Sequence, residues 1–331
     1  MTRTIGIIGS GACGTALAMT AAKAGNNVLM WAREADIVAD INTRHANAYL
    51  PSARIPDAVR ATTDIGAVIA AADIALLVAP AQFTRPVLEQ AKGFWRADLP
   101  LVLCAKGIEL NTGLLLSEVA RQVLPKAKIA VLSGPGFAEE VAHEKPTAVT
   151  IAAAKRALAD DICRAMQAPY FRPYASTDII TPQVCGAIKN VLAIAAGLSD
   201  SRGFGDNGRA ALITRGLVEM ARFAVALGGR AGSVLGLSGV GDLILTANSR
   251  QSRNYSCGAS LGQNKSIKDV LGCAACKTVE GIPTAAAVLK RAAAMRVEMP
   301  ICAAVHDILS EKKSVDEAMQ DLFTRPLKSE E

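Results

Sequence analysis

The sequence predicts an α/β protein with a doubly wound sheet in its N-terminal part and an all-helical C-terminal domain. In the first half, short apolar runs alternate with helical patterns, which is typical of a largely parallel sheet covered on both faces. After about residue 180 the strand pattern stops, and Ala, Leu and Val recur at helical spacing as far as Leu322. A boundary is therefore expected between Thr181 and Pro182, which gives domains of residues 1–181 and 182–331.

Six strands and three intervening helices are expected in the first domain. Each strand is a short apolar run bounded by glycine, proline or polar residues, which suits a strand buried on both faces. The expected strands are residues 4–9, 27–31, 73–79, 100–105, 128–132 and 147–152. The expected helices are residues 11–24, 82–95 and 113–123.

The loop after the first strand carries the pattern GxGxxG, formed by Gly9, Gly11 and Gly14. Gly9 allows a tight turn, Gly11 lets the backbone approach a pyrophosphate, and Gly14 permits close packing of the helix that follows. That helix offers free N–H groups to phosphates. Between a strand and a helix, this pattern indicates a Rossmann-type dinucleotide site.

Two charged residues, Arg33 and Glu34, follow the second strand, and Glu34 lies 20 positions beyond Gly14. A carboxylate there would bind the 2′-hydroxyl of NAD, whereas an arginine would pair with the 2′-phosphate of NADP. Either residue could instead be the solvated start of a helix. The expected cofactor is NAD(P), with NADP favoured.

Composition limits the partners and the compartment. The chain of 331 residues is 51% hydrophobic, so it can bury the cores of two domains. Its net charge of +6 is scattered and aromatic residues are few, which is weak evidence for binding nucleic acid and fits a small anionic substrate equally well. No nucleic-acid partner is expected. The first strand begins near residue 4, without an apparent targeting signal, and the longest apolar stretches are too short to cross a bilayer. A cytoplasmic protein without membrane insertion is expected.

Eight cysteines without regular spacing suggest reduced thiols. Cys273 and Cys276 form a single CxxC, but a zinc site needs four ligands and no second pair accompanies it. No metal is expected.

Candidate chemistry lies after the predicted strands, because ligands of open α/β sheets bind at the carboxyl ends of the strands. Lys106 follows one strand and could contact substrate or cofactor, although a single lysine there is often only solvated. Ser133 to Phe137 follow another strand.

Lys189 and Asn190 are the polar exception in an apolar helix near residues 187–196. Burial lowers the pKa of a lysine towards the range where it exchanges protons, so Lys189 could protonate a carbonyl oxygen as hydride reaches the carbon. Lys189 could instead extend its ammonium group to solvent. Asp242, between glycines, could pair with it or simply form a turn.

A cluster of donors at residues 249–254 could bind a phosphate. It contains Arg250 and Arg253, the hydroxyls of Ser249 and Ser252, and the amide of Asn254. Taken alone, such a segment is as often an ordinary loop.

Together these residues resemble the NAD(P)-dependent glycerol-3-phosphate dehydrogenase family of bacterial type, over nearly the whole chain. The resemblance is carried by GSGACGTALA (9–18), YLP (49–51), CAKGIE (104–109), SGPGFAEEVA (133–142), KNVLAIAAG (189–197), NGRAALITRG (207–216), GVGDLILT (239–246), SRN (252–254) and VEG (279–281). It implies reversible reduction of dihydroxyacetone phosphate to sn-glycerol 3-phosphate for phospholipid synthesis, and a possible homodimer.

The resemblance also implies roles for individual residues. Lys189 is implied as the catalytic acid/base and as a substrate contact. The other implied substrate contacts are Lys106, Gly134, Asp242, Ser252, Arg253 and Asn254. The implied cofactor contacts, with the glycine loop, are Ala12, Cys13, Arg33, Lys106, Ala138, Arg253 and Glu280. Cys13 stands where an aromatic residue is common in the family, and Gly136 replaces the usual Ser or Thr.

Two other functions are compatible with a fold of this kind. A dehydrogenase for a hydroxy acid or an acyl-CoA would commonly use a histidine, and His45, His143 and His306 do not follow strand ends in a suitable motif. A non-catalytic dinucleotide sensor would not need Lys189, Asp242 and Arg253 together. The sequence therefore favours the enzyme.

Overall fold

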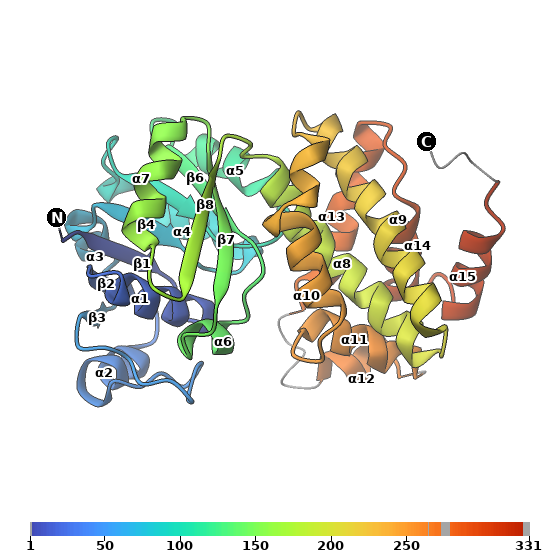
Figure 1. The fold of residues 1–331 in the computed structure, drawn as a ribbon, viewed down its shortest axis with the longest axis horizontal. Coiled ribbons are helices and arrows are strands. Elements are labelled where there is room, and N and C mark those ends of the chain that lie inside the picture. The colour runs from blue at the N-terminus through green and yellow to red at the C-terminus, as the bar shows by residue number, and fades with distance from the viewer. Residues whose placement is uncertain (1, 264, 273–278, 327–331) are drawn as a thin grey trace.

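The computed structural model describes residues 2–263, 265–272 and 279–326, which form an α/β part and a helical part side by side (Figure 1). Cys273 and Cys276 lie outside these residues. The predicted two-part architecture is confirmed, since the sheet belongs to the first part and helices α8 to α15 build the second.

The described sheet has eight strands in the order β3-β2-β1-β4-β5-β6-β7-β8. The strands are β1 (Thr4–Ile8), β2 (Asn27–Trp31), β3 (Val59–Thr62), β4 (Ile74–Leu77), β5 (Pro100–Leu103), β6 (Lys128–Ser133), β7 (Thr147–Ala153) and β8 (Phe171–Ser176). Neighbouring strands are parallel except β6 and β7.

The strand order places a topological switch point beside β1. From β1 the chain moves outward to β2 and β3, and it then returns to β4 on the other side of β1. The connections after β1 and β4 therefore diverge at their carboxyl ends, and such a switch point is where open α/β sheets bind ligands. The glycine-rich loop leaves β1 at this point.

The six expected strands are confirmed, but β3 and β8 were missed. Both are the edge strands of the sheet, and each carries exposed polar residues, Arg60 in β3 and Arg172 in β8. β8 also contains Pro173, and Tyr174 is largely exposed. An edge strand with solvated positions lacks the continuous apolar run by which the buried strands were recognised.

Helices cover the sheet, and their bounds refine the expected ones. Gly113 has a φ of 72° and belongs to a turn, so the third expected helix begins later, as α5. The second expected helix is divided into η1 (Ala81–Phe83), α4 and η2 (Lys92–Phe94). The α-helices of this part are α1 (Ala12–Lys23), α2 (Ala35–Arg44), α3 (Ile65–Ala71), α4 (Thr84–Ala91), α5 (Leu116–Val123), α6 (Ala138–Ala142) and α7 (Arg156–Met166).

The helical part is built around α8 (Thr181–Ser201), which is buried as far as Ser199. It packs against α9, α10, α11 and α13. The other elements are α9 (Gly205–Ala226), η3 (Ala231–Leu235), η4 (Leu237–Gly241), α10 (Asp242–Ala247), α11 (Arg253–Gly262), α12 (Ile267–Gly272), α13 (Gly281–Ala294), α14 (Pro300–Leu309) and α15 (Val315–Phe323).

Two glycines let α11 lie directly on α8. A Cβ atom at Gly197 would overlap the carbonyl oxygen of Tyr255, and one at Gly258 would overlap that of Ile194. The backbones of the two helices are therefore in contact, which fixes the N-terminus of α11 relative to Lys189 on α8.

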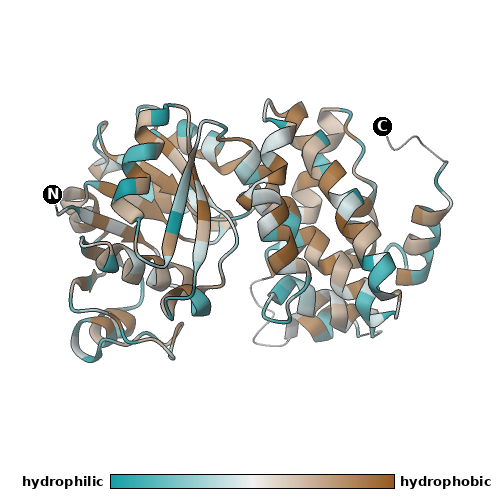
Figure 2. Cartoon of the chain, viewed as in Figure 1, coloured by the Kyte–Doolittle hydropathy of each residue, from teal (hydrophilic) through white to brown (hydrophobic). Residues whose placement is uncertain are grey.

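Hydropathy follows this packing: strands in the interior of the sheet and much of α8 carry hydrophobic residues (Figure 2). Within the described ranges, no helix is both long and apolar enough to span a bilayer.

Candidate active site

The loop between β1 and α1 has the geometry expected of a phosphate-binding turn. Gly9 has a φ of 122°, and a Cβ atom at Gly14 would overlap the carbonyl oxygen of Gly9. By contrast, a Cβ atom at Gly11 would have no described atom within 4 Å. No side chain caps α1 at Gly11, so the first N–H groups of the helix have no capping side chain there and could bind an anion. The loop thus fits a dinucleotide pyrophosphate.

The two candidate ribose contacts, Arg33 and Glu34, lie together after β2. The Arg33 Nη2 atom donates to Glu34 Oε1 at 2.9 Å, and the side chain of Arg33 is 78% exposed. Glu34 is also the N-cap of α2. Both ways of binding the ribose therefore remain open, because the guanidinium is accessible to a 2′-phosphate and the carboxylate to a 2′-hydroxyl.

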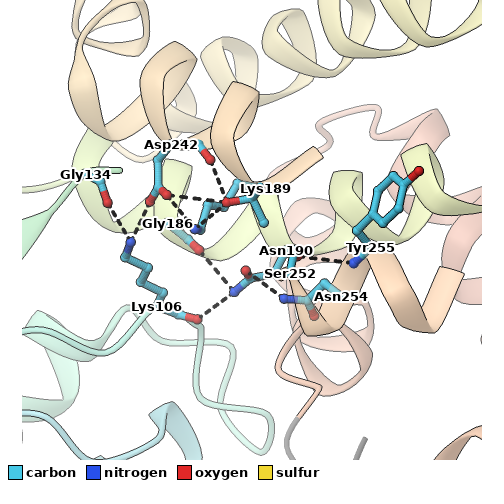
Figure 3. A network of polar contacts seen from close by, with 10 residues as sticks. Lys106, Gly134, Gly186, Lys189, Asn190, Asp242, Ser252, Asn254 and Tyr255 are labelled. Atoms are coloured by element: carbon cyan, nitrogen blue, oxygen red, sulfur yellow. Dashed lines mark hydrogen bonds and ion pairs between the residues drawn. The ribbon is translucent and has the colours of Figure 1, made fainter. Parts of the chain in front are cut away.

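Two lysines and one aspartate form the centre of the site (Figure 3). Lys189 Nζ donates to Asp242 Oδ1 at 2.6 Å, and Lys106 Nζ donates to Asp242 Oδ2, also at 2.6 Å. Lys189 is only 7% exposed and Asp242 only 1%. Lys189 therefore does not extend to solvent, and Asp242 is more than a turn residue because each of its oxygens holds one ammonium group.

The remaining contacts distinguish the two lysines. Lys189 also donates to Thr246 Oγ1 at 2.8 Å, and Lys106 donates to the carbonyl oxygen of Gly134 at 2.8 Å. Burial is the largest influence on Lys189 and lowers its pKa to about 8, against the opposing attraction of Asp242. Burial also disfavours the charge of Lys106, but Asp242 outweighs it and raises the pKa of Lys106.

A chain of amides connects this centre to α11 and α13. Asn190 Nδ2 donates to the carbonyl oxygen of Lys106 at 3.2 Å, and Asn254 Nδ2 donates to Asn190 Oδ1 at 3.0 Å. The N–H of Gly281 then donates to Asn254 Oδ1 at 2.9 Å. Ser252 caps α11 by accepting from the N–H of Tyr255 at 3.2 Å. Arg253 is the first residue of α11.

Glu280 provides a buried acceptor beside these groups. Its Oε1 atom accepts from the N–H of Ala81 at 3.3 Å, whereas its buried Oε2 atom has no hydrogen-bond partner among the described residues. Burial raises the pKa of Glu280, while the charges of Arg253, Lys189 and Lys106 oppose this effect. A buried oxygen without a partner is costly, so this carboxyl group fits a donor on a bound molecule.

Two other expected contacts lie at the starts of helices that contact each other: Cys13 is exposed in the first turn of α1, and Ala138 begins α6. Sequence reasoning missed Thr246 as a site residue and noted Asn190 only as the neighbour of Lys189. Thr246 follows Asp242 by four residues on α10, a spacing that places both on one face of a helix.

The fold and the site together define a two-domain, nicotinamide-dinucleotide-dependent dehydrogenase, whose polar centre joins the carboxyl ends of β5 and β6 to α8 and α10. The family model for the N-terminus of NAD-dependent glycerol-3-phosphate dehydrogenase matches residues 4–159, and the model for its C-terminus matches residues 178–320. The chain belongs to this family and is an NAD(P)-dependent oxidoreductase.

Individual relatives agree over nearly full length. Glycerol-3-phosphate dehydrogenase (NAD(P)+) of Rhodospirillum rubrum is 50% identical over 98% of this chain and 93% of its own. The protein of the same name from Maricaulis maris is 47% identical over 98% and 97%. The crystal structure of glycerol-3-phosphate dehydrogenase from Coxiella burnetii superposes with a TM-score of 0.93 at 36% identity, over 98% of this chain and 99% of that one.

Proposed function

We propose that this chain catalyses the reversible reduction of dihydroxyacetone phosphate to sn-glycerol 3-phosphate, with residues 1–181 binding NAD(P)H and residues 182–331 providing the acid/base. The observation that carries the proposal is the buried Lys189, held by Asp242 and Thr246. A nicotinamide cofactor held by the first part of the chain would supply the hydride for the carbonyl carbon. Lys189 Nζ donates a proton to the carbonyl oxygen during reduction, and in the reverse direction it takes the proton back.

The neighbours of Lys189 have separate proposed roles in the reaction. Asp242 keeps the Lys189 ammonium group oriented and partly offsets its burial. Lys106, whose pKa is raised, stays cationic and stabilises negative charge that develops on the oxygen. With Gly134, these residues are the proposed contacts of the reacting end of the substrate.

For the substrate phosphate we propose the N-terminus of α11, with Ser252, Arg253 and Asn254. The proposal is supported by the backbone contact of α11 with α8, which holds this terminus near Lys189. Helix N-terminal N–H groups together with a guanidinium suit a dianion.

For the cofactor we propose the glycine loop with Gly9, Gly11, Ala12, Cys13 and Gly14 at the pyrophosphate. Arg33 would select NADP through the 2′-phosphate. The further proposed contacts are Lys106, Ala138, Arg253 and Glu280, of which Glu280 offers its unpartnered oxygen.

The proposal is tested by following NADPH oxidation with dihydroxyacetone phosphate or unphosphorylated dihydroxyacetone. We expect Arg253→Ala to lower kcat/KM for the phosphate ester by about 30-fold or more, because truncating one partner of a desolvated charge pair typically costs about 2–5 kcal/mol. The mutation should barely affect the unphosphorylated ketone, which we expect to be a poor substrate of the wild type because it lacks the phosphate. Equal losses with both ketones at saturating NADPH would contradict the phosphate role. No activity of the wild type would contradict the proposed reaction.

The cellular role follows from the same proposal. A cytoplasmic enzyme of this activity would supply glycerol 3-phosphate for phospholipid synthesis. A homodimer is supported by an apolar cavity of about 520 Å³ between α9, α14 and α15. Phe323 lines this cavity and is 80% exposed, and a second copy of the chain could cover it. Sedimentation of the wild type and of Phe323→Glu tests this, since the proposal requires that the variant dissociate.

A further inference from the structure

Asn47 lies in the connection between α2 and β3, outside the groups to which the proposed reaction assigns a role. It is only 1% exposed. A buried carboxamide is costly unless its donors and acceptor are used, so its partners show what the side chain stabilises.

The partners of Asn47 are at the glycine-rich loop. The Nδ2 atom donates to the carbonyl oxygen of Ser10 at 2.9 Å and to Thr15 Oγ1 at 2.8 Å. Ser10 lies between Gly9 and Gly11, and Thr15 follows Gly14. One side chain therefore holds both the centre and the end of the GxGxxG turn.

Thr15 adds a second hydrogen-bonded connection between Asn47 and the loop. Its Oγ1 atom, while accepting from Asn47, donates to the carbonyl oxygen of Gly11 at 3.1 Å. The amide thus directs the hydroxyl proton towards the backbone of the loop, and hydrogen bonds in such a chain strengthen one another. The position of the Gly11 backbone depends on Asn47 both through Ser10 and through Thr15.

The segment that carries Asn47 is itself fixed. The N–H of Tyr49 donates to Asn47 Oδ1 at 2.9 Å, and the N–H of Ile55 donates to the carbonyl oxygen of His45 at 2.8 Å, which closes the loop. Leu50 and Ile55 are buried in the core beneath β1 and α1. Asn47 therefore lies in a segment that hydrogen bonds and buried side chains anchor to the core.

We propose that Asn47 is a positioning residue for the cofactor: it holds the glycine-rich loop so that the first N–H groups of α1 point at the pyrophosphate. The inference rests on the proposed cofactor site. Without Asn47, the loop would have to be ordered when the dinucleotide binds, and that cost would appear as weaker binding.

The test compares Asn47→Asp with Asn42→Asp. Either change keeps the acceptor oxygen and replaces the N–H₂ donor. Asn42 is a matched control, because its amide bridges α2 to both backbone groups of Ala61 in β3 and does not contact the glycine loop. Dissociation constants are measured for NADPH and for adenosine 2′-phosphate, which has no pyrophosphate, together with Tm.

We expect Asn47→Asp to raise the Kd of NADPH by at least about tenfold and that of adenosine 2′-phosphate by less than about twofold, because the two hydrogen bonds that are lost hold the glycine-rich loop proposed to bind the pyrophosphate. Asn42→Asp should lower Tm without this selective loss. Unchanged NADPH binding in Asn47→Asp, or equal weakening of both ligands, would overturn the inference. Failure of the wild type to bind NADPH would instead refute the proposed cofactor site.

Thr15→Val provides a second test if Asn47→Asp does not fold. It removes the hydroxyl that links Asn47 to the Gly11 carbonyl and keeps the shape of the side chain. The same selective loss of NADPH binding is expected, and equal binding of NADPH by this variant and the wild type would overturn the inference.

Discussion

Replacing Asp242 by Asn removes the charge that both active-site lysines contact while preserving the size of the side chain. In the wild type each carboxylate oxygen lies 2.6 Å from one ammonium nitrogen. In Asp242→Asn, two buried cations would face a neutral amide, so the ammonium form of Lys189 loses its principal support.

The size of the effect follows from the pKa of Lys189, which is about 8 in the intact site. Loss of an opposite charge in contact changes a pKa by about 1–3 units, so the pKa of Lys189 should fall to roughly 6. At about pH 7.5 its protonated fraction would fall from about three quarters to about 3%, a loss of about 25-fold in the acid required for reduction. Loss of orientation adds to this, so we expect kcat/KM to fall by about 100-fold or more.

The assay is the pH dependence of kcat/KM for dihydroxyacetone phosphate reduction. Because reduction needs protonated Lys189, wild-type activity should decline as the pH rises through about 8, and in Asp242→Asn this decline should occur about 2 units lower. Asp200→Asn is the control, since Asp200 also bridges two donors, Tyr255 and Arg209, in the helical part. A decline that stays at the wild-type pH in Asp242→Asn would refute the reasoning.

Three further predictions concern single residues. Lys189→Ala should retain the fold and NADPH binding but lower kcat by about 100-fold or more, and near-normal turnover would exclude it as the acid. Arg33→Ser should raise KM for NADPH much more than for NADH, whereas equal changes would make Arg33 only a charge at the start of α2. Burial raises the pKa of Glu219 from 4.5 to about 7. Between these pH values the folded state therefore binds more protons than the unfolded state, so the stability of the wild type should fall as the pH rises from 4.5 to 7. In urea unfolding, the free energy of unfolding of Glu219→Gln relative to that of wild type should increase by about 3 kcal/mol as the pH rises from 4.5 to 7. A difference that does not change with pH would contradict this.

The sequence allowed the interior of the fold to be predicted, because buried parallel strands are continuous apolar runs and the glycine loop follows the first of them. It did not reveal the edge strands β3 and β8, whose exposed Arg60 and Arg172 break that pattern. The strand at each edge is stabilised by pairing with its neighbour rather than by burial of both faces. Such pairing depends on tertiary structure, which local patterns report only weakly.

The same distinction holds in the site. Lys189 stood out because a charged residue in an apolar helix needs an explanation, and Lys106 because it follows a strand. The sequence suggested that Asp242 could pair with Lys189, 53 positions away, but local patterns did not show that Lys106, 136 positions away, contacts the same carboxylate. No sequence pattern predicted a role for Asn47, because a single asparagine before a turn is common. Its role is inferred only from its contact with Ser10 in the structure.

The shared carboxylate also explains why two lysines occupy one site. Lys189 is the more deeply buried, with 8% of its side chain exposed against 24% for Lys106, and its additional partner is the neutral hydroxyl of Thr246. Lys106 adds the carbonyl oxygen of Gly134 to its contact with Asp242. Burial therefore lowers the pKa of Lys189, whereas Asp242 keeps that of Lys106 raised. When their surroundings give two lysines different pKa values, the lysine whose pKa is closer to 7 is suited to exchange protons, and the other is suited to remain charged. This difference supports Lys189 as the acid/base and Lys106 as the fixed cation. Because both ammonium nitrogens lie 2.6 Å from Asp242, it is their unequal burial, and not their distance from the carboxylate, that separates their roles.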